Sequence, residues 1–482
     1  MSSLSGFHQT LLPLVKEMDQ VAPRFELNSD QIDIIHEPSN FYDHLKQKIS
    51  KAQNRIFFSS LYIGRTQDEL IGCISEALKS NPNLKVHILT DALRGTREAP
   101  SKSSASLLGQ LMKEHSEQVD IRMYHTPNLN GINKSIVPNR FNEGFGLQHM
   151  KIYGFDDEVM LSGANLSSDY FTDRQDRYYL FKSKGLSDYY FDIQKTISSF
   201  SYKLLYSNNN SKFKLEWPDS NPLIEPIKNP KEFKIQSSKI LRELLRGDKF
   251  RSKIIQTEDS TSPKTFVYPI SQFTPLMITD ESTEKPSILK LLNYLKEPSI
   301  KWAFTAGYFN MLPEIKDKLL QLNSKGNVIT ASPLANGFYK SKGISGYLPE
   351  AYLYLSKNFL KEVILRSKQE TIKLREWKNG EVNTKGGWSY HAKGFWATSP
   401  GETQPSMTII GSSNYTRRAY SFDLETNALI ITNASILKNK MQRELDNLMA
   451  HTKELTLKDY DEDERKISKF AKFATKLLGK RL

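Results

Sequence analysis

The sequence has little cysteine and no long apolar run, and both shortages exclude classes of protein. The chain of 482 residues contains one cysteine, Cys73, which rules out intramolecular disulfides and cysteine-based zinc clusters. No uncharged apolar stretch approaches the roughly 18 residues of a membrane-spanning helix. Apolar residues nevertheless make up 38% of the chain, enough for large cores. We therefore expect a folded protein that is soluble or lies on a membrane surface.

Acidic residues are also in deficit. The chain has 54 acidic against 67 basic residues, a net charge of +13, with a pI near 9.3. Such a surplus favours anionic partners, namely nucleic acid, anionic lipid or phosphorylated metabolites, and is equally typical of a basic protein of the mitochondrial matrix. The N-terminal residues do not resemble a transit peptide, because Lys16 is followed by Glu17 and Asp19. If the protein is imported, we expect its presequence to be missing from this chain.

Alternating helical and strand patterns predict two related α/β halves. A strand at 55–63, a helix at 68–79 and a strand at 85–90 are matched by a strand at 301–309, a helix at 312–322 and a strand at 327–331. This order predicts sheets covered by helices. The expected segments are an N-terminal helical extension (1–30), a first half (31–206), a polar linker with a short helix at 239–245 (207–265), a second half (266–450) and a basic amphipathic helix (451–482).

One constellation of polar residues occurs twice, once in each half. The first copy runs His149, Lys151, Asp156, Asn165 and Asp176. The second copy runs His391, Lys393, Asn414 and Glu425, and in both the carboxylate follows the asparagine by eleven residues. The hairpin insertion at 399–406 accounts for the longer His-to-Asn distance in the second copy. Taken singly, each element is typical of a core histidine or a surface turn, so the hypothesis rests on the repeated order.

These residue types suit phosphoryl transfer. Residues two apart on a strand share a face, so each half presents an imidazole beside an ammonium group. Polar side chains in the following turns can donate to phosphate oxygens; the candidates are Ser162, Asn165, Ser412 and Asn414. We expect each carboxylate to orient the histidine of its own half, Asp176 serving His149 and Glu425 serving His391. With the lysines meeting phosphoryl charge, we expect neither a cofactor nor a metal ion.

The repeated pattern resembles the phospholipase D superfamily, whose mark is a duplicated His-x-Lys-x4-Asp. More closely, two stretches resemble mitochondrial phosphatidylglycerophosphate synthases: LSGANLSSDYFTDRQDRY at 161–178 and GWSYHAKGFW at 387–396. This resemblance implies two pseudo-symmetric α-β-α sandwich halves with one active site at their interface. His149, Lys151 and Asp156 would fill the first motif, and His391 with Lys393 the second. The sequence departs from the pattern at Thr398, where a second aspartate would fall.

The resemblance also implies a reaction. A phosphatidyl group would pass from CDP-diacylglycerol to sn-glycerol 3-phosphate, giving phosphatidylglycerophosphate and CMP on the route to phosphatidylglycerol and cardiolipin. We expect a phosphatidyl-histidine intermediate with His149 as nucleophile and His391 as general acid and base. Arginines would bind the acceptor's phosphate; the candidates are Arg174, Arg177, Arg417 and Arg418, of which Arg177 and Arg418 are favoured.

Three alternatives remain open at this point. A phosphatidylserine synthase would use the same donor and histidines with serine as acceptor. A hydrolase or nuclease would use water, but the sequence shows no basic-aromatic stripe typical of nucleic-acid binding, so we expect no nucleic-acid partner. A binding protein with a decayed site is disfavoured because both His-Lys pairs are present.

The C-terminal run 465–482 carries seven basic residues and no acidic one. Its apolar residues recur at helical spacing; they are Ile467, Phe470, Ala471, Ala474, Leu477 and Leu478. Such a helix can lie on an anionic membrane or dock on its own domain, and docking is slightly favoured. We expect a peripheral protein on the matrix side of the mitochondrial inner membrane.

Overall fold

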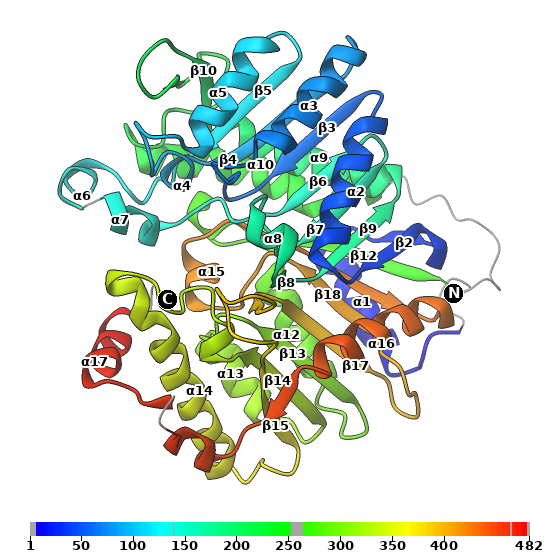
Figure 1. Cartoon of the computed structure of the whole chain (residues 1–482). Helices are drawn as coiled ribbons and strands as arrows, with labels where there is room; N and C mark the ends of the chain where they lie inside the picture. Colours follow the sequence, from blue (N-terminus) through cyan, green and yellow to red (C-terminus); the bar gives the residue numbers. More distant parts are fainter. Residues whose placement is uncertain (1–5, 138, 252–263, 463–464, 480–482) are drawn as a thin grey trace.

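Two large mixed sheets organise the chain, one in each half (Figure 1). The computed structural model describes residues 6–137, 139–251, 264–462 and 465–479. From edge to edge, the strands of the first sheet are β11 (Phe213–Glu216), β10 (Tyr202–Tyr206), β5 (Val119–Tyr124), β4 (Lys85–Asp91), β3 (Arg55–Ser59), β6 (Ile152–Phe155), β7 (Glu158–Ser162), β9 (Tyr178–Lys182) and β2 (Ile32–Ile35).

The second sheet repeats this order. From edge to edge, its strands are β20 (Thr452–Glu454), β15 (Ile372–Trp377), β14 (Lys325–Ala331), β13 (Lys301–Ala306), β17 (Lys393–Thr398), β18 (Met407–Gly411), β19 (Glu425–Thr432), β12 (Thr265–Gln272) and β1 (Phe25–Leu27). In each sheet three neighbouring strands are parallel, and the strands on either side of them are antiparallel. The predicted pair of pseudo-symmetric α/β halves is therefore confirmed.

Helices cover both faces of each sheet. The outer face of the first sheet packs against α2 (Pro38–Lys51), α3 (Asp68–Ser80) and α5 (Ser104–Glu114). The outer face of the second sheet packs against α1 (Leu11–Val21), α12 (Glu284–Tyr294), α13 (Pro313–Leu320) and α14 (Leu348–Leu365). Between the halves, one shared core takes in α9 (Lys184–Ser199), α10 (Pro230–Arg246) and α16 (Ser435–Met449). This shared apolar layer fixes the two sheets relative to each other.

Two segments differ from their sequence description. The N-terminal extension holds α1, whose apolar face packs on α12, and strand β1, which pairs with β12 of the second sheet. The region described as a polar linker supplies strand β11 to the first sheet and the 17-residue helix α10, followed by α11 (Asp248–Arg251). Phe233 and Leu241 of α10 are fully buried, which explains why a polar composition still folds here. Residues 252–263 of that region lie outside the described residues.

Short elements lie at or near the junction between the halves. They are α4 (Ala92–Gly95), α6 (Gly131–Ile136), α7 (Asn139–Asn142), α8 (Ser168–Thr172), α15 (Arg417–Ser421) and the two-residue strands β8 (Arg174–Gln175) and β16 (Ser389–Tyr390). Strands β8 and β16 pair with each other across the two halves. The last helix, α17 (Lys469–Leu478), packs on α14. None of the helices in the described ranges is long and apolar enough to cross a membrane.

Candidate active site

The two histidines of the repeated constellation meet where the halves join. His149 lies three residues before the start of β6, and His391 lies between β16 and β17. The backbone N–H of His149 donates to the carbonyl of Leu424 (2.9 Å), and the backbone N–H of His391 donates to the carbonyl of Gln175 (2.8 Å). Each histidine is thus tied to the residue that precedes the carboxylate of the opposite half.

Because of these backbone contacts, each histidine pairs with the carboxylate of the opposite half. His149 Nδ1 lies 2.8 Å from Glu425 Oε1, and His391 Nδ1 lies 2.6 Å from Asp176 Oδ2. The expectation that each carboxylate serves the histidine of its own half is wrong. A single half could not hold its histidine, because the orienting carboxylate comes from the other half. The site therefore exists only where both halves are assembled.

The His149 pair is buried and its carboxylate is weakly acidic. Burial raises the pKa of Glu425 to about 7, although Lys151 opposes the shift. Ser412 Oγ donates to Glu425 Oε2 at 2.5 Å, so Ser412 orients this carboxylate instead of lining the cavity as a phosphate donor. Burial also lowers the pKa of His149 well below its usual value, with Lys151 adding to the effect. The lowered pKa favours the neutral imidazole, which is the form that acts as a nucleophile.

The His391 pair has a more acidic partner. Burial works against ionisation of Asp176, but Lys393 and His391 outweigh it and hold the pKa of this carboxyl below its usual value. Burial and the charge of Lys393 lower the pKa of His391 to about 3. Gly163 makes the close approach possible, because a Cβ there would lie 2.4 Å from Lys393 Nζ and 2.6 Å from Asp176 Oδ1. The glycine in this turn thus gives Lys393 room beside Asp176.

Both lysines lie behind the histidines. Lys151 Nζ donates to the carbonyl of His149 (2.7 Å), and Lys393 Nζ donates to the carbonyl of His391 (2.8 Å). Burial lowers the pKa of each ammonium group. An anionic phosphoryl group arriving in the site would stabilise both charges.

A cavity of about 490 Å³ opens in front of this assembly. Both histidines line it, as do Asn165 and Asn414. Asn414 Oδ1 is buried and has no hydrogen-bond partner in the described part of the chain. Ser162 is absent from the lining, because its hydroxyl donates to the carbonyl of Arg177 and accepts from the N–H of Ala164. Of the four polar residues predicted to bind phosphate, the two asparagines are therefore placed to do so.

The arginines divide in a way that the sequence did not indicate. Arg418 and Arg174 line the cavity, whereas Arg417 does not. Arg177, the other favoured candidate, is buried outside the cavity: it pairs with Glu444 (2.8 Å) and stacks on Trp396. This ion pair joins the first half to α16. Arg94 and Arg97 also line the cavity. They were not predicted from the sequence, although they follow directly after β4, and the carboxyl ends of parallel strands are where ligands bind in such sheets.

Asp156 lies away from the catalytic residues. It sits in the tight turn between β6 and β7 with φ of 49°. Its carboxylate accepts from the backbone N–H groups of Gln53, Asn54 and Arg55 at 2.8, 2.7 and 2.9 Å. The expectation of a catalytic role is therefore not supported by its position, which fastens the turn to the start of β3.

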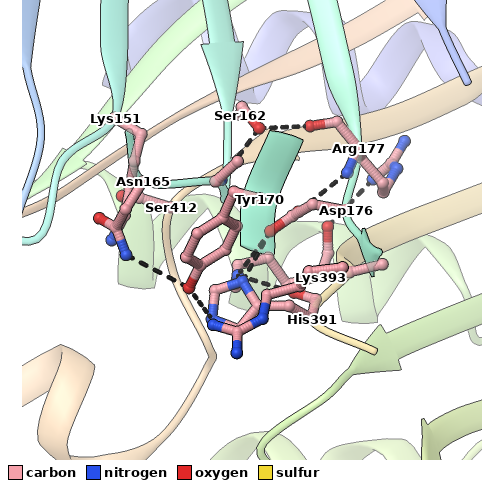
Figure 2. A network of polar contacts seen from close by, with 12 residues as sticks. Lys151, Ser162, Asn165, Tyr170, Asp176, Arg177, His391, Lys393 and Ser412 are labelled. Carbon is pink, nitrogen blue, oxygen red and sulfur yellow. Dashed lines mark hydrogen bonds and ion pairs between the residues drawn. The ribbon is translucent and has the colours of Figure 1, made fainter. Parts of the chain in front are cut away.

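Two tyrosines that sequence reasoning missed flank His391. The rings of Tyr170 and Tyr308 each lie 5.2 Å from the imidazole at 80°. Tyr170 reaches between Asn165 and His391 (Figure 2): its hydroxyl accepts from Asn165 Nδ2 (3.2 Å) and lies 3.4 Å from His391 Nε2. Tyr308 lies just past the end of β13, where a longer strand was predicted; the strand ends at Ala306, and Tyr308 lines the cavity.

Comparisons with known proteins identify the class of fold. Residues 45–196 match the family model described as "Cardiolipin synthase, PLD-like domain". The crystal structure of phosphatidylserine synthase from Haemophilus influenzae superposes with a TM-score of 0.70 at 18% sequence identity, covering 98% of both chains. The whole chain thus has the phospholipase D-like fold in two halves.

Two curated relatives identify the family within this class of fold. The CDP-diacylglycerol–glycerol-3-phosphate 3-phosphatidyltransferase of Saccharomyces pastorianus is 55% identical over 468 residues, or 95% of this chain and 89% of the relative. The mitochondrial CDP-diacylglycerol–glycerol-3-phosphate 3-phosphatidyltransferase of Gallus gallus is 32% identical over 95% of this chain and 85% of the relative. The chain belongs to the CDP-diacylglycerol–glycerol-3-phosphate 3-phosphatidyltransferase family, as its motifs predicted.

Proposed function

We propose that this protein transfers a phosphatidyl group from CDP-diacylglycerol to sn-glycerol 3-phosphate, giving phosphatidylglycerophosphate and CMP. The observation that carries the chemistry is that two histidines from different halves line one cavity, each held at Nδ1 by a buried carboxylate. This arrangement turns Nε2 of each ring away from its carboxylate, and Nε2 of His391 lies 3.4 Å from the hydroxyl of Tyr170. Family membership supports the identity of donor and acceptor.

The proposed first step forms a covalent intermediate. Nε2 of His149 attacks the phosphorus that carries diacylglycerol, a P–N bond forms, and the P–O bond to CMP breaks. His391, as imidazolium, gives its proton to the departing oxygen. Glu425 accepts the Nδ1–H of His149 and stabilises the positive charge that develops on this ring. Lys151 and Lys393 supply positive charge from behind the two histidines.

The second step reverses these roles around the same phosphorus. A hydroxyl group of glycerol 3-phosphate gives its proton to His391 Nε2 as its oxygen attacks, and the P–N bond to His149 breaks. His391 is thereby reprotonated for the next cycle, so acid and base catalysis balance. Asp176 opposes the lowering of the pKa of His391 by burial and Lys393, and the negative charge of the bound donor's phosphates raises this pKa further, which favours the imidazolium form that the first step needs.

The arginines that line the cavity suit an acceptor that carries a phosphate group. Among the described residues, four arginines line it: Arg94, Arg97, Arg174 and Arg418. Each is held by a carboxylate, for example Arg174 by Asp169 (2.7 Å) and Arg418 by Asp423 (2.8 Å). Arginine held in this way is well suited to phosphate, and this favours glycerol 3-phosphate over serine.

We further place the protein at the mitochondrial inner membrane, peripheral on the matrix side. The support is the mitochondrial name of the Gallus gallus relative, a lipid donor, and the net charge of +13, which favours anionic lipid.

Product analysis tests the reaction. Purified protein would receive labelled CDP-diacylglycerol in detergent with glycerol 3-phosphate, serine or no acceptor, followed by mass spectrometry of the lipids. We expect phosphatidylglycerophosphate and stoichiometric CMP from glycerol 3-phosphate alone. Phosphatidylserine as the main product, or phosphatidic acid formed equally fast without acceptor, would replace the proposal by a serine transferase or a hydrolase.

A further inference from the structure

The C-terminal helix α17 docks on the protein yet turns aromatic residues outward. Its contact with α14 uses small side chains, since Ala471 and Thr475 are buried. The residues that flank the helix also form hydrogen bonds. Before it, the Ser468 N–H donates to Glu350; after it, the carbonyl of Gly479 accepts from Asn310 Nδ2. Phe470 and Phe473 face solvent. The predicted apolar face is thus split, with small residues inward and phenylalanines outward; the side chains of Leu477 and Leu478 lie outside the described part.

A second exposed apolar group comes from the first half. Ile136 at the end of α6 and Phe141 on α7 face solvent. The exposed fractions of these two residues and of Phe470 and Phe473 lie between 48% and 72%. Together these four residues form what we call the rim surface. Large apolar side chains exposed in such a group are a mark of an interaction site.

The rim surface adjoins the mouth of the active-site cavity on both sides. Phe141 lies two residues before Glu143, which lines the cavity and pairs with Arg97. On the other half, the ring of Phe470 contacts Tyr347 (4.8 Å), and the next residue, Leu348, lines the cavity. In Figure 1, α6 with α7 and α17 project on the same side of the molecule, one above and one below the junction of the halves. The cavity therefore opens between the two apolar groups.

Basic residues accompany the aromatic ones. Lys469, Lys472 and Lys476 of α17 are exposed, and so is Lys134 of α6. The run 465–482 contains no acidic residue. Phenylalanines that reach outward among lysines match the two layers of a bilayer surface, acyl chains below and anionic headgroups above.

From this placement we infer that the rim surface docks the active-site mouth onto an anionic lipid bilayer, with α6–α7 and α17 inserting on opposite sides of the cavity. This inference rests on the proposed function, because a diacylglycerol-linked donor must leave the bilayer to reach the histidines. Contact on both sides of the mouth would shelter the acyl chains from water along that path. It would also hold the cavity facing the membrane, which a single helix could not do.

Paired substitutions test the rim surface. One variant combines Phe470→Ser with Phe473→Ser, and another combines Ile136→Ser with Phe141→Ser. The control combines Leu365→Ser with Ile436→Ser, residues that are 83% and 62% exposed. Leu365 ends the 18-residue helix that begins at the mouth, which places it about 25 Å away along the axis. Ile436 belongs to α16, which lies across the molecule from α17 in Figure 1, so the control removes exposed apolar side chains outside the rim surface.

The measurements are sedimentation with vesicles of anionic or zwitterionic phospholipid, and activity on vesicles or on detergent-dispersed CDP-diacylglycerol. We expect each rim variant to lose at least about tenfold in binding to anionic vesicles and a similar factor in vesicle activity, with detergent activity unchanged. The control should bind and act like the unmodified protein. Parallel light scattering tests the other occupant of such a surface, a second copy of this chain.

Several outcomes would overturn the inference. Unchanged vesicle binding in either rim variant would remove that side of the mouth from the membrane contact. An equal loss in the control would mean that general surface hydrophobicity drives binding. Dimers that the rim substitutions dissociate would assign the surface to self-association. If the unmodified protein shows no transferase activity in detergent, the proposed function fails, while the vesicle-binding comparison still decides the rim surface.

Discussion

The two histidine sites contain the same residue types but differ in their neighbours. Glu425, the partner of His149, has a pKa raised to about 7 by burial and accepts from Ser412. Asp176, the partner of His391, keeps a pKa below its usual value despite burial because Lys393 and His391 offset it. His391 is also flanked by two tyrosines, and its side chain is less exposed than that of His149 (4% against 12%). A duplicated motif therefore sets positions, while unequal surroundings set roles.

The largest expected effect comes from removing either histidine. His149→Ala and His391→Ala should each lower kcat by at least about 10³-fold, because nucleophile and acid-base catalyst act as one unit. Rapid quench with labelled CDP-diacylglycerol separates the roles. His391→Ala should still accumulate a slowly formed phosphatidyl adduct on His149, and His149→Ala should form none. An adduct mapped to His391 would exchange the two assignments, and near-normal turnover in either variant would end the two-histidine scheme.

The crossed carboxylates give the next largest effect. Asp176→Asn should lower kcat about 10²- to 10⁴-fold, because an ionised carboxylate is lost that fixes the tautomer of His391 and stabilises its imidazolium form. Glu425→Gln should cost less, about 10- to 100-fold, because Glu425 is only partly ionised at neutral pH.

A pH profile distinguishes the two carboxylates. Glu425 accepts from His149 best when ionised, so kcat of the unmodified protein should rise with pH through about 7. Glu425→Gln should lose this acidic limb, whereas Asp176→Asn should retain it at a lower rate. Adduct formation on His149 should also slow in Glu425→Gln. If it slowed only in Asp176→Asn, the pairing within each half that the sequence suggested would be correct in solution.

The sequence predicted the symmetric features and missed those that depend on contacts between halves. Strand and helix order, both His-Lys pairs and the hairpin insertion followed from local patterns, and β17 ends at Thr398 just before that insertion. The pairing of each histidine with the carboxylate of the other half did not follow from local patterns. It depends on hydrogen bonds across the junction, from the His149 N–H to Leu424 and from the His391 N–H to Gln175. Adjacent residues also diverge: Asp176 points to His391, while Arg177 turns into the core to meet Glu444.

A smaller effect is expected from the hydroxyl of Tyr170. Tyr170→Phe removes the group that lies 3.4 Å from His391 Nε2 and should lower kcat about 2- to 10-fold, the worth of one hydrogen bond. Tyr308→Phe is the matched control, because its ring has the same distance and angle to His391. The kcat and its pH profile should change in Tyr170→Phe and stay unchanged in Tyr308→Phe. Equal losses would mean that both tyrosines serve only to pack the imidazole.

The smallest effect on catalysis is expected at Asp156, where the second half has Thr398 at the matching position of the motif. Asp156 ties three backbone N–H groups to a turn, whereas Thr398 lies within β17 opposite Lys301. Asp156→Asn should therefore lower the free energy of unfolding by about 1–3 kcal/mol and leave kcat of the folded protein unchanged. Asp157→Asn, at an exposed neighbour, is the control for lost charge. Denaturant unfolding and kcat measured well below the melting transition test this; a loss of kcat without a loss of stability would return Asp156 to the catalytic group.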